Sequence, residues 1–393
     1  MKRLMYLSAF FLMTVNSLLA QQIDNNKLNQ ILEKAELTNS EAIIIYQNDE
    51  LIAEKYFGIG HPDTLIESMS CTKSIVALAM MALWEDGVLD SLETAVYTIY
   101  PEWNQGIKKK ITVGHLLNMT SGIQNVPNAG KEIYPSPDFV KLALAAELSD
   151  VPGTTFSYNN KALNLLAGIV ERTTSQKLDK YIAKRIFNPL QIYDYAWTKD
   201  EAGNPHVMAG CQLKPRDFTK IGQLVLNKGM YKQKRVLKAS TIEKMLRPTD
   251  QYRGYGLLWW LQYEKVNYLV DESIVQKLKM LDVDKGFIRK VELMQGHYED
   301  YQAFEKQLIQ VFGPNYNQYL YEHLPAGLQI RKKLFIGSLI GYNANGYLGN
   351  YLVIIPSKKL VAIRMISHDS YDWEARTSNS FTDFIELVED LGM

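Results

Sequence analysis

A serine and a lysine three residues apart, Ser70 and Lys73, form the first pair in this sequence whose types and spacing could do chemistry. They stand at the start of a segment, 74–84, whose apolar residues recur at helical spacing. A helix places residues i and i+3 on one face, so the two side chains would lie side by side. A lysine whose pKa is lowered by burial can take the proton of a serine hydroxyl, which is otherwise a poor nucleophile. The alternative is an N-cap serine followed by a solvated lysine.

A second candidate is the loop 152–160, which presents Tyr158 and Asn160 just before a helical pattern at 161–172. A phenol beside a lysine ammonium loses its proton more easily, so Tyr158 could serve as a general base or acid. An amide such as Asn160 can hold the lysine or a substrate carbonyl. A core tyrosine and a helix-capping asparagine are the alternative.

A third candidate is the segment 344–351, which contains two glycines and directly precedes a predicted strand at 351–355. Glycines allow the backbone to approach a ligand closely. A backbone N–H there could face Ser70 and complete an oxyanion hole. A plain glycine-containing start of a strand is the alternative.

The three motifs in this order resemble the serine β-lactamase and penicillin-binding-protein superfamily. The resemblance is closest to the class C β-lactamase-like branch, which includes esterases, D,D-peptidases and 6-aminohexanoate-dimer hydrolases. It covers about residues 40–262 and 334–392, and three further segments support it: 84–90, 111–122 and 215–217.

This resemblance implies a role for each matching residue. Ser70 would be the acylated nucleophile, Lys73 and Tyr158 would share proton transfer, and Asn160 matches the loop asparagine of the family. The same resemblance leaves open which of Lys73 and Tyr158 is the primary base.

The third motif departs from the family pattern. Where class C enzymes have Lys-Thr-Gly and relatives often have His-x-Gly, this chain has Ala344-Asn345-Gly346. The cationic or polar side chain that binds a substrate carboxylate in the family is therefore missing at Ala344. This absence favours a neutral ester or amide as substrate. Gly346 and Tyr347 can still supply strand backbone, and we expect the N–H groups of Tyr347 and Ser70 to form the oxyanion hole. Asn345 could hydrogen-bond the substrate.

The elements that must position these residues follow an uneven order along the chain. A hairpin is predicted at 41–58, a long helical block at about 106–250, strands at 256–263, 334–340, 351–355 and 360–366, and a closing helix at about 381–391. This order predicts an α+β fold, β-lactamase/transpeptidase-like, with an antiparallel sheet built from both ends of the chain, flanked by helices and carrying a mostly helical subdomain. Residues 264–332 read as a helical insertion, either a lid over the cleft or a partner surface.

Composition bounds the class of protein. Of 393 residues, 43 are Lys or Arg and 43 are Asp or Glu, so there is no basic excess with which to bind nucleic acid. Six scattered histidines and two cysteines predict neither a metal site nor a disulfide framework, and no cofactor is expected.

The pattern of charged and apolar residues at the N-terminus is typical of a targeting signal. Lys2 and Arg3 precede an apolar run, 4–20, that is short for a membrane span and ends in a small residue. We interpret residues 1–20 as a cleaved signal peptide, with an uncleaved anchor as the alternative, and residues 21–393 as one catalytic unit.

The sequence therefore predicts an exported serine hydrolase, periplasmic or secreted, that cleaves an ester or amide in a small molecule or peptide through an acyl-enzyme on Ser70. The alternative is a non-hydrolytic sensor or binding protein that uses the same cleft. No nucleic acid, metal or membrane span after signal cleavage is expected.

Overall fold

The computed structural model describes residues 23–392 except 127, 282, 325–327 and 375–378. The predicted signal peptide lies outside these residues. Within them, no helix is long and apolar enough to cross a membrane.

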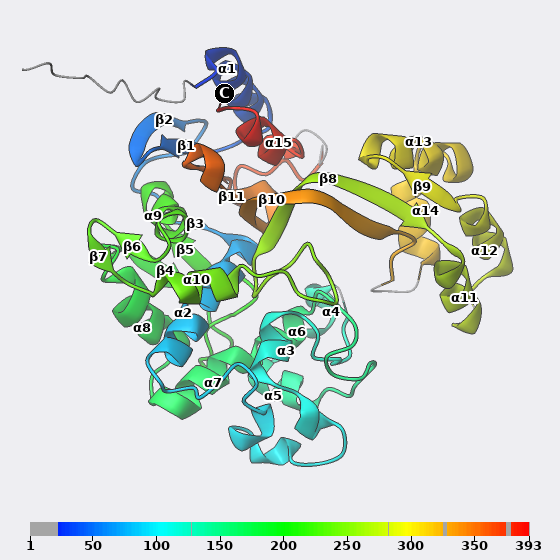
Figure 1. Ribbon diagram of the computed structural model, residues 1–393, viewed down its shortest axis with the longest axis horizontal. Coiled ribbons are helices and arrows are strands. Elements are labelled where there is room, and N and C mark those ends of the chain that lie inside the picture. Colours follow the sequence, from blue (N-terminus) through cyan, green and yellow to red (C-terminus); the bar gives the residue numbers. More distant parts are fainter. Residues whose placement is uncertain (1–22, 127, 282, 325–327, 375–378, 393) are drawn as a thin grey trace, which may run out of the picture.

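A seven-stranded sheet forms the centre of the molecule (Figure 1), and every neighbouring pair of its strands is antiparallel. Its strands come from both ends of the chain, as the sequence predicts, so the α+β class is confirmed. In spatial order they are β2 (Glu50–Tyr56), β1 (Ala42–Gln47), β12 (Leu360–Met365), β11 (Asn350–Ile355), β10 (Lys332–Gly346), β8 (Trp260–Val270) and β9 (Gly296–Tyr298).

Both faces of the central strands are covered, which explains their nearly continuous apolar sequences. On one face, Ile43 and Ile45 of β1 pack with α1 (Asn25–Leu37) and α15 (Phe384–Glu389). On the other face, Ile44 joins the main core, which surrounds α2 (Thr72–Glu85).

Helix α2 is the centre of that main core. Every residue from Thr72 to Leu83 is buried, as expected for a helix that is apolar on all sides. The predicted helix over 74–84 is therefore confirmed and begins two residues earlier. Because α2 is enclosed, any polar side chain at its start must find its partners inside the protein.

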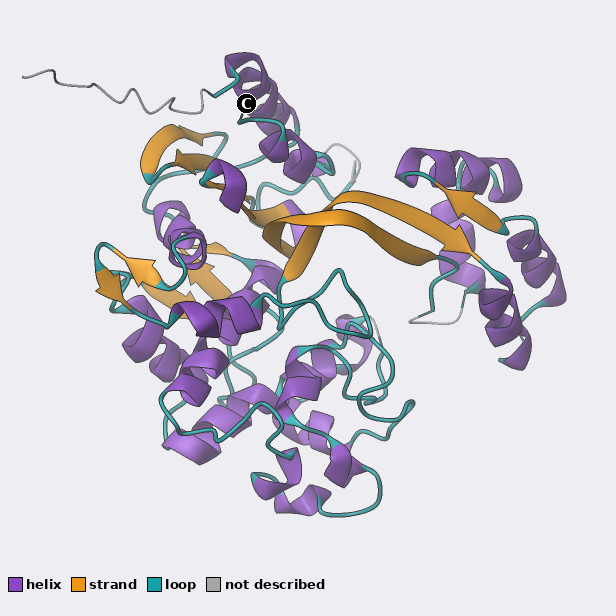
Figure 2. Cartoon of the chain, in the orientation of Figure 1, coloured by secondary structure: helices purple, strands orange, loops and turns teal. Residues whose placement is uncertain are grey.

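The predicted helical block packs around α2, mostly as short helices (Figure 2). Two small sheets that the sequence reading missed interrupt it: β3-β5-β4, made of Ile66–Glu67, Cys211–Leu213 and Tyr195–Trp197, and β6-β7, made of Met230–Tyr231 and Lys234–Arg235. The helices are α3 (Val113–Leu117), α4 (Ala129–Glu132), α5 (Phe139–Ala145), α6 (Asn160–Leu163), α7 (Leu165–Thr174), α8 (Leu178–Ile182), α9 (Pro215–Leu226) and α10 (Ala239–Met245).

Strands β8 and β10 run on beyond the body of the sheet as a long two-stranded ribbon (Figure 1). At its far end lie α11 (Glu272–Met280), α12 (Lys285–Glu292), α13 (Tyr301–Phe312) and α14 (Tyr316–His323). We call residues 264–332 the distal module. The prediction that this segment is helical is wrong for 264–270, which belong to β8. Polar residues alternate there with Val266, Tyr268 and Val270, a strand pattern that the sequence reading missed.

The distal module has a hydrophobic core of its own. Phe304 of α13 is fully buried in it, stacks on Tyr268 at 5.5 Å and meets Tyr298 edge-on at 5.3 Å. These residues form a cluster separate from the main core around α2.

We therefore expect Phe304→Ala to destabilise the distal module by about 3–5 kcal/mol, because it empties a buried aromatic site. Hydrogen exchange should show faster exchange in α11–α14, with α2 unchanged. The control is Ile309→Ala on the same helix, where the side chain is 45% exposed and the loss should stay within about 0.5 kcal/mol. Equal acceleration in α2 would contradict a separate core.

Candidate active site

The structure brings Ser70 and Lys73 together. Ser70 lies in a 3₁₀ turn, Met69–Cys71, that leads directly into α2. The Lys73 Nζ lies 2.8 Å from the Ser70 Oγ and 2.6 Å from the Met208 carbonyl oxygen. Lys73 is only 1% exposed. The lysine is therefore not solvated, which removes the alternative interpretation of this motif.

Burial controls the protonation of Lys73. It lowers the pKa of the Lys73 amine to about 7, because a charged ammonium loses its hydration inside the protein. Among the described residues, no carboxylate forms a salt bridge with Lys73 that would restore the charge. A neutral amine beside a serine hydroxyl is the arrangement that general-base activation of a nucleophile requires.

Tyr158 lies over the same lysine. The Lys73 Nζ is 5.0 Å from the centroid of the Tyr158 ring. Burial raises the pKa of Tyr158 to about 12, and its hydrogen bond with Ser70 opposes part of that rise. At neutral pH Tyr158 is therefore a phenol that can donate a proton. Its loop is held by the Asn125 side chain, which donates to the Tyr158 carbonyl oxygen at 3.0 Å.

An aromatic neighbour that the sequence reading missed fixes the ring of Tyr158. Trp260, the first residue of β8, stacks on it with centroids 5.7 Å apart and planes 18° apart. Tyr255 meets Trp260 edge-on at 4.8 Å and closes the cluster. The base of the long ribbon thus lies against the candidate site. A Trp-rich predicted strand was the only signal for this contact in the sequence.

Asn160 is the first residue of α6 but is not its cap. Asn159 caps the helix, because its side chain accepts a hydrogen bond from the Ala162 N–H. The Asn160 Oδ1 is buried and has no hydrogen-bond partner among the described residues. An unpaired buried acceptor two residues from Tyr158 is free to receive a donor from a ligand.

The third motif lies at the end of β10 and not at the start of β11. Gly346 is the last residue of β10, and a Cβ there would lie 2.6 Å from the Ser68 carbonyl oxygen. Only glycine permits this approach, which brings the end of the strand against the segment that precedes Ser70. Tyr347 follows in a short turn, and its side chain is 58% exposed.

The side chains of Ala344 and Asn345, which precede Gly346, lie in different environments. Ala344 is buried in the main core. Asn345 pairs across the sheet with Tyr351, whose ring stacks on Phe384 of α15 on the opposite face. The Asn345 Oδ1 is buried without a partner, and no hydrogen bond of the described residues joins Asn345 to Ser70 or Lys73.

Cys71 and Cys211 are both buried and free. Cys71 packs into the main core beside the nucleophile, and burial raises the pKa of its thiol. Within the described part of the chain, no group of three or more His, Cys, Asp or Glu side chains could hold a metal ion.

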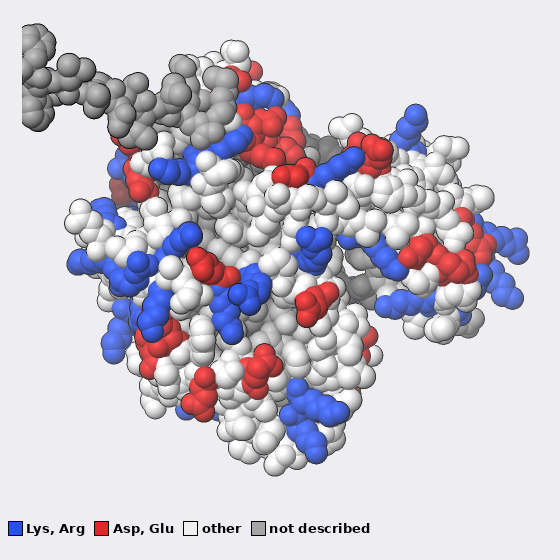
Figure 3. All heavy atoms as spheres, in the orientation of Figure 1, with Lys and Arg blue, Asp and Glu red and all other residues white. Residues whose placement is uncertain are grey.

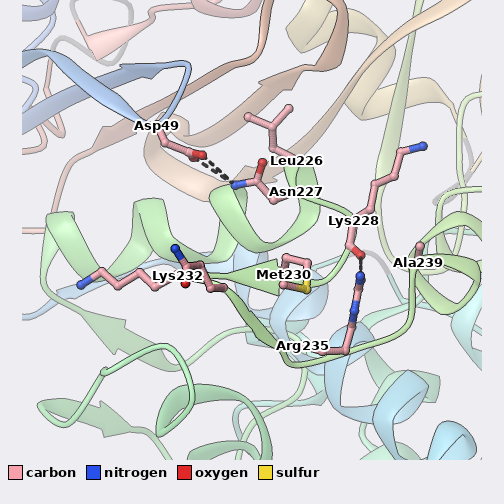
Figure 4. Close-up of a pocket in the computed structure, with 9 residues that line it drawn as sticks. Asp49, Leu226, Asn227, Lys228, Met230, Lys232, Arg235 and Ala239 are labelled. Carbon is pink, nitrogen blue, oxygen red and sulfur yellow. Dashed lines mark hydrogen bonds between the residues drawn. The ribbon is translucent and has the colours of Figure 1, made fainter.

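A separate surface hollow lies away from these residues (Figure 4). In it, the Asn227 side chain donates to the Asp49 carboxylate and Arg235 donates to the Lys228 carbonyl oxygen. Its charged groups are thus largely engaged within the protein, and none of the predicted site residues lines it. The face in Figure 3 carries basic and acidic side chains side by side.

The fold and the site together define a class of protein. The Beta-lactamase family model matches residues 32–383, so this chain belongs to the β-lactamase family. The predicted resemblance and fold class are confirmed.

One curated relative covers about half of this chain. Protein flp of Staphylococcus aureus strain MW2 is 27% identical over 212 residues, which is 49% of this chain and 41% of that protein. The chain thus spans about two fifths of the length of the curated relatives that it matches first.

Solved structures share the fold at low identity. A candidate β-lactamase from Bacteroides dorei superposes with a TM-score of 0.65 at 16% identity, covering 94% of this chain and 99% of that one. A candidate 6-aminohexanoate-dimer hydrolase from Bacillus anthracis has a TM-score of 0.62 at 18% identity, covering 93% and 83%. A penicillin-binding protein homologue from Pyrococcus abyssi has a TM-score of 0.56 at 18% identity, covering 90% and 75%.

The pKa of Lys73 predicts a pH profile. The reaction of Ser70 with a fluorophosphonate should accelerate about tenfold between pH 6 and pH 8 and then level off, because the neutral amine accumulates above a pKa of about 7. Tyr158, with a pKa of about 12, contributes no step in that range. The measurement is the labelling rate by mass spectrometry. A rate that is flat from pH 6 to pH 8 and rises only near pH 10 would contradict the role of the buried lysine.

The stacking of Trp260 on Tyr158 predicts a second effect. Trp260→Leu should slow the labelling of Ser70 about threefold to tenfold, because the phenol loses the ring that holds it in place. Trp260→Phe should recover most of the rate. The control is Trp84→Leu, another partly buried tryptophan, whose ring centroid lies 5.0 Å from the Lys244 Nζ and which makes no ring contact with Tyr158. If both substitutions change the rate equally, the stack has no positioning role.

Proposed function

We propose that this protein is a serine hydrolase that cleaves an ester or amide bond through an acyl-enzyme on Ser70. The observation that carries the proposal is a buried lysine amine, 2.8 Å from the serine hydroxyl, with burial lowering its pKa to about 7. Membership of the β-lactamase family supports the same chemistry.

In the first half of the reaction, the neutral Lys73 amine takes the Ser70 proton as the oxygen attacks the scissile carbonyl. The backbone N–H groups of Ser70 and Tyr347 hold the resulting oxyanion, and the Gly346 contact with Ser68 supports this placement. The Lys73 ammonium then gives this proton to the leaving group, and the Tyr158 phenol, which is hydrogen-bonded to Ser70, can relay it. The pKa values of about 7 and about 12 favour Lys73 over Tyr158 as the primary base.

In the second half, water attacks the acyl-enzyme and the same pair returns the proton to Ser70. Asn160 has a buried, unpaired side-chain oxygen and is proposed to accept a hydrogen bond from the substrate. Asn345 has such an oxygen too, but it shares a sheet face with Tyr351 toward α15, so it is left out of the proposed substrate contacts. Ala344 offers no cation for a substrate carboxylate, so a neutral ester or amide is the preferred substrate. No cofactor is needed for any of these steps.

The proposed setting is outside the cytoplasm, with residues 1–20 as a cleaved signal and a small molecule or peptide as the partner. The names of similar structures, a penicillin-binding protein homologue and a candidate 6-aminohexanoate-dimer hydrolase, support an amide or peptide substrate without naming it.

A fluorophosphonate should give one adduct, on Ser70, that Ser70→Ala abolishes. The matched control is Ser74→Ala, four residues later in α2, where the hydroxyl donates to the Leu258 carbonyl oxygen and takes no part in the reaction. Mass spectrometry of the digested protein locates the adduct. Labelling at another residue, or none at all, would refute the proposal.

One observation favours a second function, a penicillin-binding-like sensor that does not hydrolyse its ligand. It is the departure of Ala344-Asn345-Gly346 from the family pattern. Turnover of a short-chain nitrophenyl ester separates the two functions, because a sensor would be acylated once and release no further product.

A further inference from the structure

Four aromatic rings gather at the end of β10. Tyr347, Tyr371 and Trp373 lie with centroids 4.8–6.5 Å apart, and His368 stacks on Trp373 at 5.5 Å. We call these four residues the aromatic rim. The side chains of Tyr347 and Trp373 are 58% and 43% exposed. Contiguous exposed aromatic residues, unlike single ones, are a feature that marks binding surfaces.

The aromatic rim is built onto the segment that carries the nucleophile. Tyr371 packs against a small buried cluster of Met69, Leu348 and Ile366. Met69 directly precedes Ser70, and Leu348 directly follows Tyr347. Both have left-handed backbone, with φ of 51° and 68°, a conformation that costs energy for residues other than glycine. Packing thus ties Tyr371, and through it the rim, to the residue that precedes Ser70.

Segment 368–374, which carries three of the four rim residues, is also held by hydrogen bonds. The buried Asn379 side chain accepts from the Asp372 N–H at 3.0 Å and donates to the Asp372 carbonyl oxygen at 2.8 Å. The Trp373 indole N–H donates to the His368 carbonyl oxygen at 3.3 Å. Because the polar edge of the indole is engaged within the loop, the part left open to solvent is mainly the apolar ring. An anchored, preorganised ring loses little entropy when it binds a ligand.

Two exposed carboxylates beside the rings restrict the charge that a ligand can carry. Asp369 and Glu374 are exposed on the same short segment as the rings. Their carboxylates repel an anionic group, in agreement with the missing cation at Ala344. A flat, neutral ring that can stack on tyrosine and tryptophan fits this surface.

We propose that the aromatic rim is a substrate-binding subsite that stacks on a neutral aromatic ring in the group next to the scissile bond. The inference rests on the proposed function and adds a substrate class to it: hydrolysis of ring-bearing neutral esters or amides. Trp373 is the main specificity-determining residue, because it presents the larger open ring and lies outside the catalytic machinery.

Three neutral thioesters test the proposal: S-ethyl thioacetate without a ring, S-benzyl thioacetate with a ring on the leaving group, and S-ethyl phenylthioacetate with a ring on the acyl group. Thiol released in the acylation step is measured, so the assay works even if the acyl-enzyme is not hydrolysed. At least one ring-bearing thioester should acylate wild-type protein faster than S-ethyl thioacetate. In Trp373→Ala, the ratio of the ring-bearing to the ring-free acylation rate should fall about threefold to tenfold, and the rate with S-ethyl thioacetate should be unchanged.

The matched control is Tyr321→Ala, which removes a tyrosine that is 71% exposed on α14 of the distal module and should change no ratio. A fourth thioester carries an ammonium in place of the ring. If Trp373→Ala lowers the acylation rate most for this ammonium thioester, the rim binds cations and the proposal is overturned. An unchanged ring preference in Trp373→Ala overturns the subsite alone, whereas absence of any reaction at Ser70 refutes the proposed function as well.

Discussion

The burial of one amine against one hydroxyl is the constraint on which the rest of this structure depends. Lys73 is enclosed at the start of a helix with no carboxylate paired to it, and its polar contacts are the Ser70 hydroxyl and the Met208 carbonyl oxygen. An isolated buried ammonium costs far more free energy than a buried neutral amine, so the site holds the lysine near its titration point. A lysine in water would remain protonated and could not act as a base at neutral pH.

That constraint needs a large body of packed residues around it. Helix α2 is buried along most of its length, between the sheet and the surrounding short helices, and this enclosure is what desolvates Lys73. The sheet contributes a second constraint at the end of β10, where Gly346 lets the strand approach the segment before Ser70. Ser70 and Lys73 on one side, and the Tyr347 N–H proposed for the oxyanion on the other, are therefore positioned by two different layers, which must pack correctly against each other.

The ribbon connects the site to a part of the protein that folds around its own core. Trp260 at the base of β8 stacks on Tyr158, while Tyr268, further along the same strand, belongs to the core of the distal module. A single strand thus touches both the site loop and the module.

The sequence by itself determined the class of the fold, the helix that carries Ser70 and Lys73, and the order of the motifs. These features depend on local spacing: i and i+3 share a helix face, and apolar strands at both ends of the chain form one antiparallel sheet. Strands at 256–263 and 334–340 were predicted, but 264–270 were assigned to the helical insertion, and the alternation of polar residues with Val266, Tyr268 and Val270 was missed there. Tertiary structure alone decided the rest. The pKa of Lys73 and the stacking of Trp260 on Tyr158 depend on residues far apart in the chain. So does the contact of Tyr347 with Tyr371 and Trp373 in the aromatic rim. No local pattern encodes which of them meet, because burial and stacking are properties of the packed whole.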